Sequence, residues 1–232
     1  MIVAEILVAL KEYIRPGVTT LDLDALSEEL VAKRHAQSAF KGYHGYPFTL
    51  CVSVNEEVVH GMPSKKRVLK EGDIVSLDFG AVIEGYYGDA AITVPVGKIS
   101  EEAKRLCKTA EESLYAGIDR AVVGNRLSDI SHAIQEYVET RGFSVVREFV
   151  GHGIGQHLHE SPQIPNYGAP GKGVKLKPGM VFAIEPMINM GRPEVEVLQD
   201  QWTAVTVDRQ LSAHFEHTVA VTEGGPEILS RI

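Results

Sequence analysis

Hydrophobic residues recur at helical spacing in two stretches near the start of the chain. They lie at Ile6, Leu7, Leu10, Tyr13 and Ile14, and then at Leu23, Leu26 and Leu30. This spacing of three or four residues predicts two amphipathic helices. The run Arg15-Pro16-Gly17 ends the first helix, and Thr20 or Asp22 can cap the second.

The same pattern recurs about halfway along the chain. A displacement of 107 positions, as from Gly17 to Gly124 (124 − 17 = 107), aligns two halves of the sequence. Among the identical pairs that it superimposes are Glu5 and Glu112, Leu7 and Leu114, Ala9 and Ala116, Asp22 and Asp129, Lys70 and Lys177, and Gly72 and Gly179. It also aligns KEGDIVSLD (70–78) with KPGMVFAIE (177–185), and both runs end in a carboxylate. Each half is therefore predicted to contain two helices followed by strands.

Further stretches have the hydrophobic runs typical of strands, at residues 50–55, 73–80, 89–96, 180–188, 195–206 and 214–221. No linker rich in Pro, Gly or Ser separates the two halves. We therefore predict one domain over residues 1–232. Its class is α+β, with an internal pseudo-two-fold and helices covering a mixed, mostly antiparallel sheet.

The composition is that of a globular protein, with 44% hydrophobic and 23% charged residues. A net charge of −8 disfavours broad binding to DNA, RNA or anionic membranes. Two cysteines exclude a disulfide scaffold and indicate a reducing cytosol, so we expect a cytoplasmic protein. The apolar opening MIVAEILVAL contains Glu5 and lacks a basic segment, so it is predicted to be a helix and not a signal peptide.

Two carboxylates lie on neighbouring predicted strands. Glu84-Gly85 is typical of a two-residue hairpin turn, which would place Gly80 opposite Asp89. Asp78 would then be a diagonal neighbour of Asp89 on the same face of the sheet. Alone, the pair also fits two solvated side chains near a turn.

Three more residues make a metal site the better interpretation. Glu185 closes the apolar run MVFAI, and Glu216 lies inside the strand-like HFEHTVAV, where an unpartnered charge is costly. His152 belongs to the glycine-rich GHGIGQHLHE. Four carboxylates with one imidazole favour Mn, Fe(II) or Co over a structural zinc. Bridging carboxylates would hold two such ions close together and acidify a shared water.

These residues and their surroundings resemble the methionine aminopeptidases, and most closely the bacterial type I form. The motifs that carry the resemblance are YHGYP (43–47), NEEVVHGMP (55–63), SLDFG with YYGDAA, FVGHGIGQHLHESPQIPNYG (149–168), FAIEPMI (182–188) and FEHTVAVTEGGPEIL. The resemblance extends from about residue 3 to the end. It implies the duplicated "pita-bread" fold with a curved sheet. Family members usually have another charged helix before the segment that opens here.

The resemblance also implies roles for individual residues. Asp78 would bind one divalent ion, His152 and Glu185 the other, and Asp89 and Glu216 both. The two ions would be Co, Mn or Fe(II), with Zn or Ni as alternatives. Three catalytic residues are implied: Glu185 as proton shuttle, His159 as donor to the oxyanion, and His60 as a contact of the leaving amine. His60 and His159 would also be substrate-binding.

The methionine pocket implied by the resemblance consists of Tyr43, Tyr46, Cys51, Leu158 and Trp202, with Phe40 at its rim. Soft, aromatic walls suit a thioether. Plain core packing is the alternative for each of these residues. The family often has Cys at the position of Phe40, which would change the width of the pocket.

The implied function is removal of the N-terminal methionine from nascent proteins and peptides when the second residue is small. The enzyme would be a monomer that contacts the ribosome transiently. Because the segment between Glu185 and Glu216 carries more acidic than basic residues, the run Lys65-Lys66-Arg67 is the candidate for that contact; a solvated turn is its alternative.

Four related protein classes fit less well. Prolidases and aminopeptidase P usually add a separate N-terminal domain. Type II methionine aminopeptidases have a long insertion between the last two glutamates, which here are 31 positions apart (216 − 185 = 31). A pita-bread domain that only binds proteins would have lost ligands, whereas this chain has all five.

Overall fold

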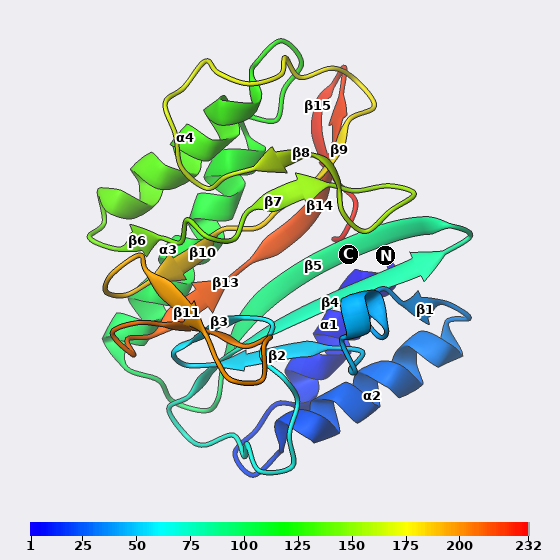
Figure 1. Ribbon diagram of the computed structural model, residues 1–232, viewed down its shortest axis with the longest axis vertical. Coiled ribbons are helices and arrows are strands. Elements are labelled where there is room, and N and C mark those ends of the chain that lie inside the picture. Colours follow the sequence, from blue (N-terminus) through cyan, green and yellow to red (C-terminus); the bar gives the residue numbers. More distant parts are fainter. Residues whose placement is uncertain (232) are drawn as a thin grey trace.

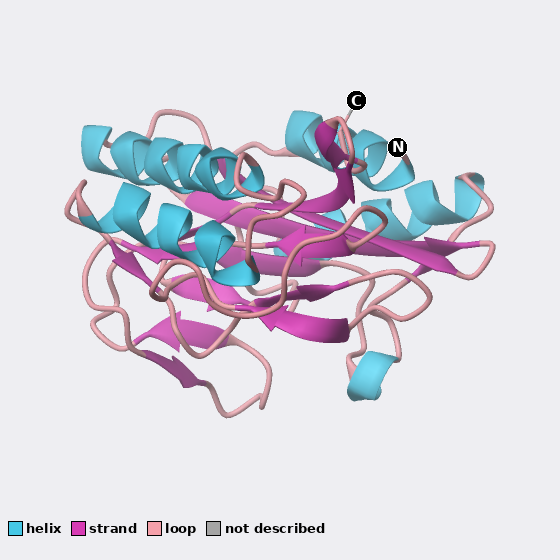
Figure 2. Cartoon of the chain, turned by 90° about the horizontal axis from the view of Figure 1, so that it is seen from above, coloured by secondary structure: helices cyan, strands magenta, loops and turns pink. Residues whose placement is uncertain are grey.

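The computed structural model describes residues 1–231 (Figure 1). Its helices are α1 (Ile2–Tyr13), α2 (Thr20–Lys33), α3 (Glu101–Ile118) and α4 (Leu127–Glu139), with a short 3-10 turn η1 (Tyr43–Gly45). Figure 2 shows the four α-helices gathered on one side of the strands. Within the described residues, no helix combines the length and hydrophobicity needed to cross a bilayer.

The strands form one large and two small sheets. The large sheet contains β1 (Gln37–Ser38), β2 (Cys51–Val54), β4 (Ile74–Ile83), β5 (Tyr86–Pro95), β7 (Gly151–Gly153), β8 (Glu160–Ile164), β9 (Val181–Ile184), β14 (Glu216–Thr222) and β15 (Gly225–Ile228). Its order is β1-β4-β5-β14-β9-β7-β8, with β2 on β4 and β15 on β14. One small sheet has the order β13 (Ser212–His214), β10 (Met187–Asn189), β6 (Ser144–Val145). The other has the order β11 (Val195–Val197), β12 (Ala204–Thr206), β3 (Glu57–Val59). All of these named strands pair antiparallel.

The predicted duplication is visible in the backbone. Corresponding glycines in the loops after α1 and α3 both have positive φ, 94° at Gly17 and 97° at Gly124. Gly17 N–H donates to the Leu69 carbonyl at 2.8 Å, and Gly124 N–H donates to Leu176 at 3.2 Å. Since 176 − 69 is also 107, the two halves repeat the same contacts as well as the same residues.

The start of α2 differs in one detail from the sequence prediction. Thr19, and not Thr20, is its N-cap, and Asp22 is the third residue of the helix. The Asp22 carboxylate accepts from the Thr19 N–H at 2.9 Å, while the Thr19 hydroxyl oxygen accepts from the Asp22 N–H at 3.2 Å. This reciprocal capping box satisfies two donors at the helix terminus.

The β4–β5 hairpin has the predicted register. Glu84 and Gly85 both have positive φ, as a two-residue primed turn requires, and Gly80 pairs with Asp89. Other long runs are interrupted. The predicted strand 180–188 is divided into β9 and β10 at Glu185-Pro186, and 195–206 is divided into β11 and β12, which pair with each other.

Each half of the chain buries its own core against the helical side of the sheet. The first half packs α1 and α2 on β4 and β5, with Leu10, Leu23 and Leu77 fully buried. The second half packs α3 and α4 on β9 and β14, around residues such as Leu106 and Phe182. The opposite side of the sheet, near the centre, is left for polar side chains.

A buried carboxylate on α2 fastens the segment 39–50, which carries four of the cavity-lining side chains described below. Asp24 is 6% exposed and accepts from the N–H groups of Thr49 at 2.8 Å and Leu50 at 3.0 Å. Asp24→Ala leaves both donors unpaired and should lower the free energy of unfolding by about 2–3 kcal/mol in urea titrations. The control Glu28→Ala removes an exposed pair with Lys41 on the same helix and should cost under about 0.5 kcal/mol. Equal losses would contradict this role of Asp24.

Candidate active site

Strand pairing brings three of the four predicted carboxylates onto one face. Ala91 of β5 pairs with Asp78 of β4 on one side and with Glu216 of β14 on the other. Side chains that are paired across strands lie on the same face, and so do residues two apart along a strand. Asp89, two residues before Ala91, therefore joins Asp78 and Glu216.

The same rule places His152 and Glu185. Ala183 of β9 pairs with His152 of β7 and with Thr218 of β14. Glu185 lies two residues after Ala183, and Glu216 two residues before Thr218. All five residues that the sequence predicts as metal ligands consequently converge from both halves of the chain.

The four carboxylates cannot all carry a full charge without compensation. Burial raises the pKa of all four, and in Asp89 it does so to about 7 although the Ala90 N–H and Asp78 hydrogen-bond to it. Repulsion from Asp89 further raises the pKa of Asp78 and of Glu216. Oδ1 of Asp78, Oδ1 of Asp89 and Oε1 of Glu216 are buried with no hydrogen-bond partner in residues 1–231. Such a cluster requires either protons or bound cations.

His152 is prepared to act as a neutral ligand. Its Nδ1 lies 2.9 Å from the Gly153 carbonyl, which can only accept, so Nδ1 carries the proton. The unprotonated Nε2 then faces Oε1 of Glu185 at 3.5 Å. Burial lowers the pKa of His152 to about 4. Donor atoms of His152, Asp89 and Glu216 lie within 4.8 Å of one another, so these three form a candidate metal site.

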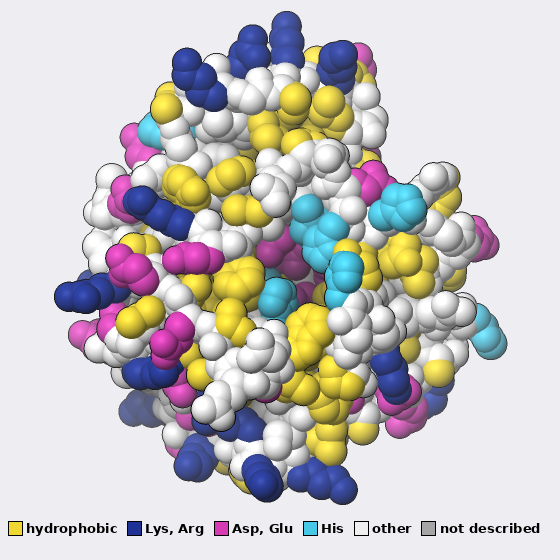
Figure 3. Space-filling model, viewed as in Figure 1, with side chains coloured by type: hydrophobic (Ala, Val, Ile, Leu, Met, Phe, Trp, Pro, Cys, Tyr) yellow, Lys and Arg dark blue, Asp and Glu magenta, His cyan; other side chains and the backbone are white. Residues whose placement is uncertain are grey.

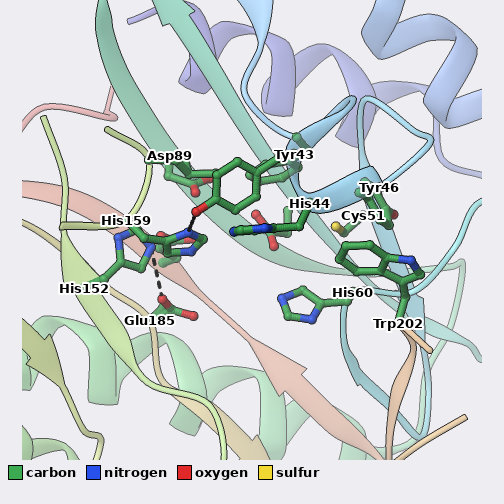
Figure 4. A pocket seen from close by; sticks show the side chains of 14 residues that line it. Tyr43, His44, Tyr46, Cys51, His60, Asp89, His152, His159, Glu185 and Trp202 are labelled. Atoms are coloured by element: carbon green, nitrogen blue, oxygen red, sulfur yellow. Dashed lines mark hydrogen bonds and ion pairs between the residues drawn. The ribbon is translucent and has the colours of Figure 1, made fainter. Parts of the chain in front are cut away.

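A cavity of about 370 Å³ opens over these residues, and Figure 3 shows acidic side chains at its base between histidines and apolar groups. It is lined by every residue that the sequence analysis placed in the site: Phe40, Tyr43, Tyr46, Cys51, His60, Asp78, Asp89, His152, Leu158, His159, Glu185, Trp202 and Glu216. Figure 4 shows its two ends: Tyr46, Cys51 and Trp202 lie at one, and Asp89, His152 and Glu185 at the other.

The apolar end has rigid walls. The rings of Tyr46 and Trp202 meet edge to face with centroids 5.0 Å apart. The Tyr46 hydroxyl donates toward the carbonyls of Leu50 and Gly61, at 3.1 and 3.2 Å. Phe40 packs directly over Gly80, where an added Cβ would lie 2.7 Å from the Phe40 ring. The absence of a side chain at Gly80 of β4 therefore leaves room for the Phe40 ring in the cavity wall.

Two of the predicted histidines, His60 and His159, line the cavity without being predicted cation ligands. His159 shares a 2.6 Å hydrogen bond between its Nδ1 and the Tyr43 hydroxyl, and its ring lies 4.2 Å from that of His152. His60 stands perpendicular to Phe149, with centroids 5.3 Å apart. Burial lowers the pKa of His60 to about 4 and also lowers that of His159. Both rings are thus neutral near pH 7, each with one N–H to donate.

The structure adds two histidines that the sequence analysis did not select. His44 lines the cavity beside Tyr43. His214 is 1% exposed, and its Nε2 lies 3.9 Å from Oε2 of Glu185. His44 had a signal in the sequence because it lies within the YHGYP motif, whereas the position of His214 beside Glu185 follows only from the fold.

Comparison with known proteins agrees with this geometry. The chain matches the sequence pattern of metallopeptidase family M24 over residues 1–223. It is 58% identical to methionine aminopeptidase 1 of Bacillus subtilis, over 96% of this chain and 90% of that protein. The chain belongs to family M24 and, within it, to the methionine aminopeptidases. A methionine aminopeptidase of Clostridium acetobutylicum is 56% identical over 99% of this chain and 92% of the relative.

Solved structures confirm the predicted pita-bread fold. The methionine aminopeptidase of Thermotoga maritima has a TM-score of 0.98 at 53% identity, covering 100% of this chain and 93% of that one. That of Rickettsia prowazekii has a TM-score of 0.97 at 40% identity, with 99% and 93% covered. The prolidase of Pyrococcus furiosus, at 23% identity and a TM-score of 0.80, shares the fold over 61% of its chain.

Proposed function

We propose that this M24 protein removes the N-terminal methionine from nascent proteins and peptides when the second residue is small. The observation that carries the proposal is the cavity itself, which joins an apolar end to a cluster of four carboxylates and a neutral histidine. Membership of the methionine aminopeptidases supports it independently. Residues 1–232 would form a single catalytic domain, because both halves contribute side chains to the cavity.

We propose that these residues hold two divalent cations. Asp78 would hold one, His152 and Glu185 the other, and Asp89 and Glu216 both. Cation binding would give partners to the buried carboxylate oxygens that lack them, and it would lower the raised pKa values of the carboxyls. Oxygen donors with one imidazole suit Mn, Fe(II) or Co, and Zn or Ni less well. When bound, such cations supply Lewis-acid activation of a water molecule and of the scissile carbonyl.

The chain's own groups would supply selection and proton transfer. Tyr46, Cys51 and Trp202 receive the methionine side chain, while the acidic end of the cavity attracts the free α-amine. An internal peptide bond has no such amine, so the enzyme acts only at an N-terminus. Glu185 accepts a proton from the attacking water and passes it to the leaving amine.

The two histidines complete the reaction site. His159 donates an N–H to the oxyanion that develops on the scissile carbonyl. His60 contacts the amide nitrogen that becomes the leaving amine. Since both rings are neutral near pH 7, each can donate without adding positive charge to a cation site.

A peptide panel tests the function. We expect kcat/KM for Met-Ala-Ser to exceed that for Ala-Ala-Ser, for Met-Ile-Val and for acetylated Met-Ala-Ser by about 100-fold or more, because each competitor lacks the methionine, the small second residue or the free amine. EDTA should abolish release and Mn²⁺ should restore it. Efficient cleavage of Ala-Ala-Ser, or full activity in EDTA, would refute the proposal.

We propose further that the protein works as a cytoplasmic monomer and meets nascent chains at the ribosome. Lys65 and Lys66 are exposed, whereas the Arg67 guanidinium donates to the Val54 carbonyl at 3.1 Å and lies near two glutamates. Within the run Lys65-Lys66-Arg67, the two lysines are therefore the side chains free to contact RNA. Lys65→Glu/Lys66→Glu should weaken co-sedimentation with ribosomes at low salt several-fold.

The internal repeat offers a matched control. Lys172, which corresponds to Lys65, and Lys175 are exposed in the second half of the chain. Lys172→Glu/Lys175→Glu makes the same change in charge and should leave ribosome binding nearly unchanged. If both double variants bind equally, the contact does not lie at Lys65 and Lys66.

A further inference from the structure

His214 is a buried titratable residue that the proposed reaction does not use. It is the last residue of β13 and is 1% exposed. Neither of its ring nitrogens has a hydrogen-bond partner among residues 1–231. Buried polar side chains without partners are uncommon in native proteins, so this one calls for an explanation.

The backbone of His214 is anchored by two hydroxyl groups. Thr93 Oγ1 on β5 accepts from the His214 N–H at 2.9 Å and donates to the His214 carbonyl at 2.8 Å. Ser76 of β4 lies 2.8 Å from the same hydroxyl oxygen and can donate to it. The backbone of His214 is therefore fixed from the neighbouring strands, independently of what the ring contacts.

The chain passes between the large sheet and a small sheet twice at this point, from β9 to β10 and from β13 to β14. This crossing turns His214 toward Glu185. In the small sheet Met187 pairs with His214, whereas in the large sheet Ile184 pairs with His217. The two chain segments between these pairs pass each other, and Glu185 lies in one of them. As a result Nε2 of His214 is 3.9 Å from Oε2 of Glu185.

The two oxygens of Glu185 consequently face different histidines. Oε1 lies 3.5 Å from Nε2 of His152, and Oε2 lies toward His214. A neutral imidazole has one N–H, and a carboxylate oxygen accepts it well. Since 3.9 Å slightly exceeds hydrogen-bond length, a modest rotation of either side chain completes the bond.

We propose that His214 is a positioning residue whose Nε2–H binds Oε2 of Glu185 and orients this carboxylate as cation ligand and proton shuttle. The inference rests on the proposed function. Residues that hydrogen-bond to a metal ligand fix its orientation, and their loss typically costs 10- to 100-fold in metal affinity or activity. His214 contributes no wall to the methionine end of the cavity, so its loss should spare KM.

Variants at His214 separate positioning from simple packing. In metal-stripped protein, His214→Leu should bind Mn²⁺ about 10-fold more weakly by calorimetry, and its kcat on Met-Ala-Ser should fall about 10-fold or more with KM within twofold. His214→Gln keeps a donor N–H and should stay within about threefold of the wild type. His132→Leu is the control and should match the wild type, because His132 of α4 lines a different pocket.

Three outcomes would overturn the role of His214. One is His214→Leu with wild-type Mn²⁺ affinity and kcat. Another is a His214→Gln variant that thermal melting shows to be folded but that loses as much Mn²⁺ affinity and kcat as His214→Leu. The third needs no variant: ¹⁵N NMR of histidine-labelled wild type should show His214 protonated at Nε2, and protonation at Nδ1 alone would exclude the bond. If the wild type binds no Mn²⁺, or Glu185→Gln binds it normally, the proposed function itself fails.

Discussion

Glu216→Gln should reduce kcat at least about 1,000-fold at saturating Mn²⁺, because the amide is a far weaker ligand than the carboxylate proposed to hold both cations. The change is nearly isosteric, so the cavity keeps its shape. Metal content per chain, measured by elemental analysis, should fall with kcat. Glu227→Gln, an exposed residue on the adjoining strand β15, makes the same chemical change and should retain full activity. Retention of more than a tenth of the wild-type kcat would rule out the two-cation site.

The same variant should be more stable than the wild type once metal is removed. Glu216 is 2% exposed, and burial together with repulsion from Asp89 and Glu185 raises its pKa. A carboxyl whose pKa is raised by folding stabilises the protein fully below its unfolded pKa, and that contribution is lost as the pH rises through the folded pKa. For Asp89, with a pKa of about 7, the loss falls between about pH 4 and 7.

Thermal melting in EDTA therefore reports on the charge of this carboxylate cluster and does not require an active enzyme. The wild type should lose stability from pH 5.5 to pH 8, and Glu216→Gln should lose less, with a Tm about 3 °C higher at pH 8. Mn²⁺ should stabilise the wild type more at pH 8 than at pH 5.5, since protons compete with the metal. A wild type that is equally stable at both pH values in EDTA would mean that the carboxylates do not repel one another.

The hairpin that carries Asp78 and Asp89 could be predicted from sequence because its turn is local. Glu84-Gly85 adopts the positive φ values that set the register of ten residue pairs. The duplication was equally accessible, since a repeat of 107 positions maps onto matching caps, glycines and bridges. The hairpin turn is a local signal, and the repeat is a direct match between two segments of the sequence.

The junction between sheets could not be predicted in this way. Residues 180–188 are predicted as one strand, yet the chain leaves one sheet for another at Glu185-Pro186. That break depends on partners about 30 positions away, at Phe215 and its neighbours. For the same reason His214 was not recognised: only the junction brings it to Glu185.

Tyr43 shows how a residue can be placed correctly and yet have a second role. The family resemblance places Tyr43 in the methionine pocket, and Tyr43 does line the cavity. Its hydroxyl, however, lies 2.6 Å from Nδ1 of His159, a residue 116 positions away. If Tyr43 donates this bond, the single proton of the neutral ring is placed on Nε2. Tyr43 would then help to prepare His159 as a donor, in addition to forming a wall.

His159→Ala should lower kcat about 10²- to 10³-fold, because its Nε2–H is proposed to donate to the developing oxyanion, while metal content and KM change little. Tyr43→Phe keeps the ring but removes the O–H that selects the tautomer, and should lower kcat about 10-fold, as expected for one hydrogen bond. Tyr86→Phe at the exposed tip of the β4–β5 hairpin is the control and should have no effect. If His159→Ala instead loses mainly metal, His159 is a ligand; if Tyr43→Phe raises only KM, Tyr43 is a pocket wall alone.

The double variant distinguishes a shared role from two separate ones. Adding Tyr43→Phe to His159→Ala should lower kcat no further, since the hydroxyl acts through the imidazole that is no longer there.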